Sequence, residues 1–225
     1  DADVRYFPAW VEGVFEDAAE PEVAPELAPY GDAFNILFAG NIGEAQDFPA
    51  ILAAADRLRG RRDIKWIVLG DGRAAESVRA EIAARGLGDR VFMLGRFPVE
   101  RMPSFFAGAG ALLVSLKAEP VFAMTIPGKV QSYMSAGKPI IAMLDGEGGR
   151  VVTEAGAGLV VASGDSAGLA EAVARLADLG GSDRRAMGAA GKAYCSRNFD
   201  RGVLLGRLEG WLAELRDRGT SSRRS

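Results

Sequence analysis

Six short apolar runs, separated by longer segments, are the feature of this 225-residue chain that most restricts its fold. Strands buried on both faces form near-continuous apolar runs, and parallel strands need a crossover segment, usually a helix, between them. The pattern therefore predicts a parallel sheet covered by helices on both faces. The six runs are Asn35–Ala39, Ile64–Leu69, Val91–Leu94, Ala111–Leu116, Pro139–Leu144 and Leu159–Val161.

The segments between the runs carry apolar residues at helical spacing. Phe48, Ile51, Leu52, Ala55 and Leu58, for example, recur at i, i+3, i+4, i+7 and i+10. We therefore expect an α/β fold, a doubly wound, Rossmann-like parallel sheet of about six strands. Right-handed crossovers in such a sheet place the ligand site at the carboxyl ends of the strands, near the reversal of strand order.

The two ends of the chain differ in character from this central pattern. Residues 1–33 are rich in proline and acidic residues and are expected to be a linker that enters the fold. Residues 34–219 are expected to form one ligand-binding domain, and residues 220–225 a disordered tail. A last helix, from about Asp200, carries an apolar stripe that we expect to be partly exposed or covered by residues 4–15. The stripe is Leu204, Leu208, Trp211 and Leu215.

Composition excludes several classes of protein. The chain has no histidine and one cysteine, Cys195, so Ser-His-Asp triads, Cys-His dyads, histidine zinc sites and disulfide frameworks are excluded within it. A net charge of −3 argues against a general nucleic-acid binder. No apolar run is long enough to span a bilayer, and the chain begins at Asp1 without a leader pattern. We expect a cytoplasmic protein cut from a longer one.

The loop after the first run contains two glycines ahead of a helix. Glycines let backbone amides approach a phosphate, and a helix N-terminus favours an anion. A tight turn that needs glycine explains the loop equally well, because the full Gly-x-Gly-x-x-Gly pattern is missing. The candidate phosphate-binding residues are Gly40, Asn41, Ile42, Gly43, Glu44 and Gln46.

The loops after the second and third runs supply further candidates. Gly70-Asp71-Gly72 can present Asp71 to a ligand, although Asp-Gly is also an ordinary turn. Leu94-Gly95-Arg96-Phe97 leads toward Met102, and an arginine and an aromatic ring just past a strand end are suited to framing a nucleotide base. Phe105 and Phe106 are instead expected to belong to the core.

The segment from Thr125 to Pro139 carries the strongest candidate. Thr125 is placed to cap a helix that Pro127 opens, with Ile126 between them. Lys129 then lies in the first turn, where the helix dipole disfavours a cation unless an anion binds nearby. A solvated surface lysine is the alternative.

Taken together, these motifs resemble a known family. Residues 35–162 are similar to the C-terminal domain of retaining glycosyltransferases of the GT-B type, the group 1 or family 4 class. The resemblance covers the first glycine loop, Leu69-Gly70-Asp71-Gly72, Leu94-Gly95-Arg96 and the stretch 133–139. Residues 3–15 look like the crossing from the acceptor domain into the donor domain. The chain would then be one half of a GT-B fold, without its N-terminal acceptor domain.

This chain departs from the broad family at two places. The family usually has Arg and Lys in the first loop, where this chain has Asn41 and Gln46, and two glutamates eight apart, where this chain has Met124 and Ser132. A subgroup that makes bacterial surface polysaccharides such as O-antigen, including N-acetylfucosamine-type transferases, is closer. It resembles this chain in Gly-Asn-Ile-Gly-Glu-Ala-Gln and in Ile-Pro-x-Lys-x-Gln-Ser-Tyr.

The resemblance implies transfer of a sugar, an N-acetylated amino sugar from a UDP-sugar, to a lipid-linked or saccharide acceptor. It implies that Lys129 acts on the diphosphate, that Gln131 and Ser132 hold ribose or phosphate oxygens, and that no metal or other cofactor is needed. The isolated domain is expected to be inactive, and the absent half would provide any contact with the inner face of the plasma membrane. A UDP-sugar epimerase and a non-catalytic nucleotide-binding module remain the alternatives.

Overall fold

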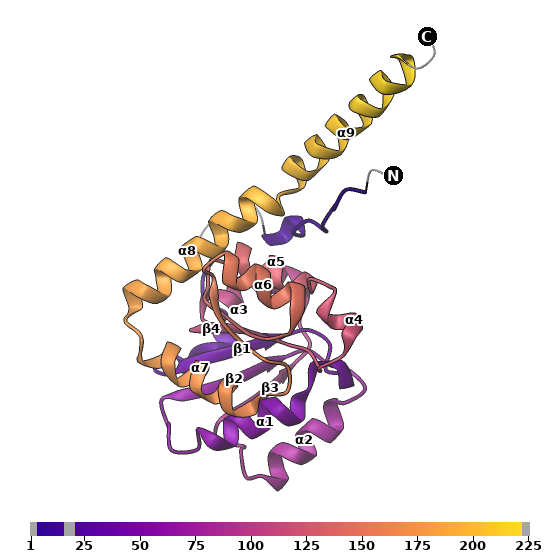
Figure 1. The fold of residues 1–225 in the computed structure, drawn as a ribbon. Helices are drawn as coiled ribbons and strands as arrows, with labels where there is room; N and C mark the ends of the chain where they lie inside the picture. The colour runs from indigo at the N-terminus through magenta and orange to yellow at the C-terminus, as the bar shows by residue number, and fades with distance from the viewer. Residues whose placement is uncertain (1–3, 16–20, 222–225) are drawn as a thin grey trace.

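A six-stranded parallel sheet forms the centre of the computed structural model, which describes residues 4–15 and 21–221 (Figure 1). The strand order is β3-β2-β1-β4-β5-β6, and every neighbouring pair is parallel. The predicted doubly wound α/β fold is therefore confirmed, with each predicted run falling on a strand. The strands are β1 Phe34–Ala39, β2 Ile64–Leu69, β3 Val91–Gly95, β4 Ala111–Ser115, β5 Ile140–Met143 and β6 Gly158–Val161.

Helices cover both faces of the sheet because alternate residues of each strand point to opposite faces. Ile36 and Phe38 of β1 pack into a core with α1, α2 and α7, whereas Leu37 and Ala39 pack into a second core with α3, α5, α6 and α8. The α-helices of the described residues are α1 Phe48–Arg57, α2 Ala75–Ala84, α3 Met102–Ala107, α4 Pro120–Ala123, α5 Gly128–Ser135, α6 Gly146–Glu154, α7 Ser166–Asp178, α8 Gly181–Asn198 and α9 Arg201–Ser221.

The strand order reverses between β1 and β4, as a doubly wound sheet requires. The chain adds β2 and β3 on one side of β1 and then crosses to add β4, β5 and β6 on the other. The β1–β4 register covers only Ile36↔Ala111 and Leu37↔Leu112. Past these two pairs, the end of β4 contacts the loop that follows β1: Ser115 Oγ donates to Gln46 O at 2.8 Å. The two strands thus separate at their carboxyl ends.

Helix α9 extends beyond the body of the domain, beside the N-terminal segment (Figure 1). Phe7 packs edge-on against Trp211 with ring centroids 6.0 Å apart, and Val11 N–H donates to Phe199 O at 3.0 Å. Leu204 is buried, but Leu212 and Leu215 are 57% and 58% exposed. The expectation that the last helix is partly covered by residues 4–15 and partly exposed is confirmed.

The ends of the predicted domain map onto the structure only in part. Residues 1–3 and 16–20 of the expected linker, and 222–225 of the expected tail, lie outside the described residues. Thr220 and Ser221 of that tail belong to α9. Within the part of the chain that is described, no helix is both long enough and apolar enough to cross a membrane.

Candidate functional site

A cleft of about 1440 Å³ opens at the carboxyl ends of β1, β2 and β3, beside the first turn of α5. It lies where β1 and β4 separate, at the position expected for ligands of doubly wound sheets. Of the residues predicted to form the site, the structure brings nine together along this cleft: Gly40, Asn41, Gly70, Asp71, Arg96, Phe97, Met102, Lys129 and Ser132.

The floor of the cleft is made by strand-end loops that lie backbone against backbone. Gly40 N–H donates to Leu69 O at 2.9 Å, and Gly70 N–H donates to Gly95 O at 2.7 Å. Gly70 has a φ of +134°, and a Cβ there would overlap the carbonyl oxygen of Gly40. Glycine is therefore required at Gly70 by backbone packing, which explains the motif without any ligand contact.

Lys129 is a half-buried cation on the inner wall of the cleft, in the first turn of α5 as predicted. Its Nζ lies 3.8 Å from the centroid of the Phe38 ring, and a Cβ atom added to Gly40 would lie 2.7 Å from the same Nζ. Among the described residues no carboxylate or hydrogen-bond acceptor pairs with this ammonium. Burial lowers the pKa of Lys129 to about 7. The site therefore holds a cation that an anion would stabilise.

Tyr133 anchors the helix that carries Lys129. Its side chain is buried, and its hydroxyl accepts a hydrogen bond from Ala39 N–H at 3.0 Å and lies 3.3 Å from Ala39 O, to which it donates. Burial, in turn, raises the pKa of Tyr133. Tyr133 was missing from the predicted site, although its spacing of four residues from Lys129 places both on one face of α5.

The opposite end of the cleft is lined by the loop after β3. Arg96 is exposed there, whereas Phe97 is half-buried and packs against Phe105 with ring centroids 4.6 Å apart. Met102 begins α3 and lines the same end. Phe105 and Phe106 are buried as predicted, but Phe106 also reaches the cleft.

Part of the first glycine loop does not line the cleft. Ile42 is fully buried, and its N–H donates to Asp71 O at 2.9 Å. Gln46 Oε1 accepts from Gly43 N–H at 3.0 Å, so the amide side chain closes its own short turn. Glu44 is exposed and begins that turn. These residues support the loop, and their predicted contact with a phosphate remains a prediction.

The entry to α5 differs from the predicted one. The N-cap is Pro127, not Thr125, and the helix begins at Gly128. Thr125 Oγ1 instead donates to Phe122 O at 3.1 Å. Pro127 has no N–H that could donate to a capping oxygen at position 125. Ile126 is half-buried and packs against the core formed by α5.

Gln131 does not reach the cleft. It is only 2% exposed, and in the amide orientation that satisfies it, Nε2 donates to Pro127 O at 2.9 Å and Gly128 O at 3.0 Å. Ser132 does line the cleft, with Oγ donating to Gly128 O at 3.3 Å. Of the two polar residues expected to hold ligand oxygens, only Ser132 is placed to do so.

The N-terminal segment contributes a wall of the cleft that the sequence did not indicate. Trp10 and Glu12 line it, and so does Phe15, which stacks on Phe106 with centroids 5.7 Å apart. Ser135 Oγ of α5 donates to Phe15 O at 2.8 Å. The linker-like composition gave no sign of this role, and the signal that could have indicated it is the spacing of four between two buried apolar residues, Val11 and Phe15.

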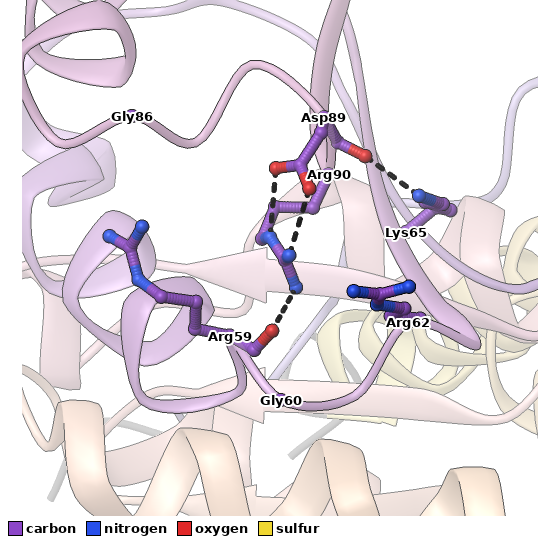
Figure 2. Close-up of a pocket in the computed structure, with 7 residues that line it drawn as sticks. All are labelled: Arg59, Gly60, Arg62, Lys65, Gly86, Asp89 and Arg90. Atoms are coloured by element: carbon purple, nitrogen blue, oxygen red, sulfur yellow. Dashed lines mark hydrogen bonds and ion pairs between the residues drawn. The ribbon is translucent and has the colours of Figure 1, made fainter.

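A second, smaller cavity of about 670 Å³ lies at the other end of β2 and β3 (Figure 2). Arg90 donates through Nε and Nη2 to both carboxylate oxygens of Asp89 and through Nη1 to Arg59 O at 2.6 Å. Lys65 donates to Asp89 O at 2.7 Å. Because three of the four cations that line this cavity, Arg59, Lys65 and Arg90, already have protein acceptors, this basic surface is less suited to a phosphate than the cleft beside Lys129.

Among the described residues, no group of three or more Cys, Asp or Glu side chains could hold a metal ion. The chemistry available in the cleft is instead that of a lysine, an arginine, backbone amides and two carboxylates, Glu12 and Asp71.

The sheet order and the position of the cleft are those of a doubly wound, Rossmann-like α/β domain, the fold that GT-B-like glycosyltransferase neighbours share. The chain belongs to the glycosyl transferases group 1 family, whose model matches residues 33–178.

Curated relatives share modest identity with this chain. A probable glycosyltransferase, WbjE, of Pseudomonas aeruginosa is 26% identical over 75% of this chain and 41% of its own length. The 2-deoxystreptamine glucosyltransferase of Streptomyces kanamyceticus is 30% identical over 64% of this chain and 36% of its own length. The chain thus spans about two fifths of the length of the curated relatives it matches.

Solved structures share the fold. The Anabaena protein HepE, crystallised with UDP and glucose, superposes with a TM-score of 0.73 at 16% identity, over 91% of this chain and 55% of its own. The C-terminal domain of LpcC, a glycosyl transferase group 1 family protein from Francisella tularensis, has a TM-score of 0.62 at 14% identity. It covers 81% of this chain and 97% of its own length.

Proposed function

We propose that the cleft binds the diphosphate of a sugar-nucleotide donor and that this chain is the donor-binding part of a retaining glycosyltransferase. The observation that carries the proposal is Lys129, a half-buried ammonium in the first turn of α5 with no anionic partner among the described residues. A helix N-terminus and a cation together form an anion site, since partial and full positive charge add.

When the bond between the sugar and the nucleoside diphosphate breaks, negative charge develops on the phosphate oxygen that had joined the two. A preorganised cation near that oxygen stabilises the transition state more than it would in water, because the site is partly shielded from solvent. Lys129 is the residue to which we assign this role, and the backbone amide of Asn41, which lines the cleft, is the supporting donor. Ser132 lines the same wall and is assigned to a ribose or phosphate oxygen.

The end of the cleft near Arg96, Phe97 and Met102 is assigned to the nucleobase. An exposed guanidinium and a half-buried aromatic ring offer a polar and an apolar surface to a planar base. UDP is the nucleotide we propose, with support from HepE, which was crystallised with UDP and with UDP-glucose. We propose no metal and no other cofactor for this site.

The sugar, the acceptor and the pathway belong to the same proposal. The Gly-Asn-Ile-Gly-Glu-Ala-Gln loop and the Lys-x-Gln-Ser-Tyr segment support an N-acetylated amino sugar, transferred to a lipid-linked or saccharide acceptor in surface-polysaccharide synthesis. Two relatives carry the names 2-deoxystreptamine glucosyltransferase and α-D-kanosaminyltransferase, and the second name denotes the transfer of an amino sugar. We propose a cytoplasmic enzyme whose acceptor domain lies outside this chain.

Calorimetric titration of the purified chain with UDP, GDP and NAD tests the proposal. UDP should bind and NAD should not. Lys129→Ala should weaken UDP binding about ten- to a hundredfold, because one charge-assisted hydrogen bond is worth about 1.5–3 kcal/mol. Lys192→Ala is the control, since Lys192 is an exposed lysine of α8 away from the cleft. Equal UDP affinities of the parent and Lys129→Ala would remove Lys129 from the site.

A further inference from the structure

The end of β1 is completed by a side chain instead of a strand. In a parallel sheet, successive residues of a central strand bond alternately to its two neighbours. Gly40 N–H bonds to Leu69 O on β2, so Ala39 faces the β4 side, where the register has already ended at Leu37↔Leu112. The Tyr133 hydroxyl takes the place of β4 and bonds to both Ala39 N–H and Ala39 O.

Tyr133 and Lys129 occupy one face of α5, one turn apart. Tyr133 bonds to Ala39, whereas Lys129 contacts the residues on either side of it, Phe38 and Gly40. Three consecutive residues of the β1 end therefore receive this face of the helix. The tyrosine bonds fix how far α5 lies from β1, and that distance decides where the Lys129 ammonium stands in the cleft.

Loss of the Tyr133 hydroxyl would leave both polar groups of Ala39 without their side-chain partner in a buried environment. Because unpaired buried backbone groups are costly, the helix and the strand end would shift apart or admit water there. Either response moves the first turn of α5. The position of Lys129 depends on a contact that lies one turn deeper in the protein.

We infer that Tyr133 is a positioning residue for the nucleotide site: it holds α5 against the end of β1 so that Lys129 faces the diphosphate. The inference rests on the proposed function for its ligand, but the contact that carries it is independent of any ligand. It assigns to Tyr133 an effect on nucleotide affinity that acts only through Lys129.

A double-mutant cycle with UDP as the probe tests this inference. Tyr133→Phe should weaken UDP binding about tenfold in the parent and less than about twofold in the Lys129→Ala background, because the lysine it positions is then absent. Equal losses in both backgrounds would overturn the inference, since a general structural effect adds independently. Unchanged UDP affinity in Tyr133→Phe would overturn it as well.

Cys195→Ala is the control for loosening α5 at a contact away from the cleft. Cys195 of α8 is buried, and its Sγ donates to Gln131 O of α5 at 3.5 Å. The change should destabilise the protein while changing UDP affinity less than about twofold. A tenfold loss of UDP affinity in Cys195→Ala would show that any loosening of α5 suffices, which contradicts a specific role for Tyr133.

Two measurements test the contact without a nucleotide. In the parent, hydrogen exchange of the Ala39 amide should be as slow as that of strand amides in the sheet, and fast exchange would overturn the inference even if Tyr133→Phe does not fold. An NMR titration of Lys129 should give a higher pKa in Tyr133→Phe than in the parent, as water reaches the ammonium. The other ionisable groups lining the cleft are Glu12, Asp71 and Arg96. If the parent fails to bind UDP, the proposed function fails, while these two measurements still decide the role of Tyr133.

Discussion

The Lys129 ammonium lies 3.8 Å from the centroid of the Phe38 ring, although the two residues belong to opposite faces of the sheet. Phe38 packs with α1 and α7 on one face, whereas α5 covers the other. The lysine side chain therefore passes over the carboxyl end of β1, through the opening that β4 leaves. The aromatic face compensates part of the charge, and a bound anion would compensate the rest.

The first prediction concerns stability. Lys129→Met should raise the free energy of unfolding of the ligand-free protein at pH 6 by about 1–3 kcal/mol, because burial lowers the pKa of Lys129 to about 7 and charging it costs free energy. The folded pKa lies below the unfolded one, so the penalty is complete below pH 7 and fades as the pH rises toward 10. Urea unfolding of the parent and of Lys129→Met at pH 6 and pH 9.5 measures the penalty and its loss with rising pH. Lys192→Met is the control, and its free energy of unfolding should equal that of the parent at both pH values.

The second prediction concerns proton uptake. At pH 8 much of Lys129 is neutral in the empty cleft, because its pKa is about 7, whereas a bound diphosphate favours the ammonium. UDP binding should therefore take up a proton, as much as about one per site, and affinity should fall as the pH rises above 7. Calorimetry in buffers of different ionisation enthalpy measures the uptake. Uptake of the same size in Lys129→Met would assign the proton to another group.

The third prediction compares two glycines with positive φ. Gly70→Ala should destabilise the fold by more than about 3 kcal/mol or prevent folding, because its Cβ would overlap Gly40 O. Gly95→Ala should cost only about 1–2 kcal/mol, since Gly95 has a φ of +88° but open space for a Cβ. Denaturant unfolding of both variants decides the matter. Equal costs would mean that backbone strain alone, and not the packing of the two loops, sets the requirement at Gly70.

The fourth prediction is that this chain alone does not turn over an acceptor. Holding donor and acceptor in a reactive geometry can supply about 7–11 kcal/mol of barrier reduction, and the cleft described here offers a wall for the donor only. The chain should bind UDP-N-acetyl sugars without transferring them to saccharide or lipid-linked acceptors. Incubation with both, following transfer and donor hydrolysis separately, measures this. Multiple turnovers of acceptor glycosylation by the purified 225-residue chain would refute it.

The sequence predicted the sheet because strands that are buried on both faces consist of near-continuous apolar residues. Each apolar run became a strand, and the helical spacing from Phe48 onward became α1. The sequence also located the strand-end loops and placed Lys129 in the first turn of α5. These features depend on local propensity and on period, both of which can be read from neighbouring residues.

The contacts between distant segments were decided by the tertiary structure alone. Nothing near Tyr133 in sequence indicates that its hydroxyl replaces a strand at Ala39, because the gap exists only where β1 and β4 separate. Gln131 was expected at the ligand but turns back onto the carbonyls of its own helix, and Trp10 of the supposed linker lines the cleft. The bond from Ser135 Oγ to Phe15 O joins residues 120 apart in sequence, so the residues near Ser135 in the chain do not indicate it. Local sequence thus determined which elements form, whereas the divergence of two strands determined which side chains they bring together.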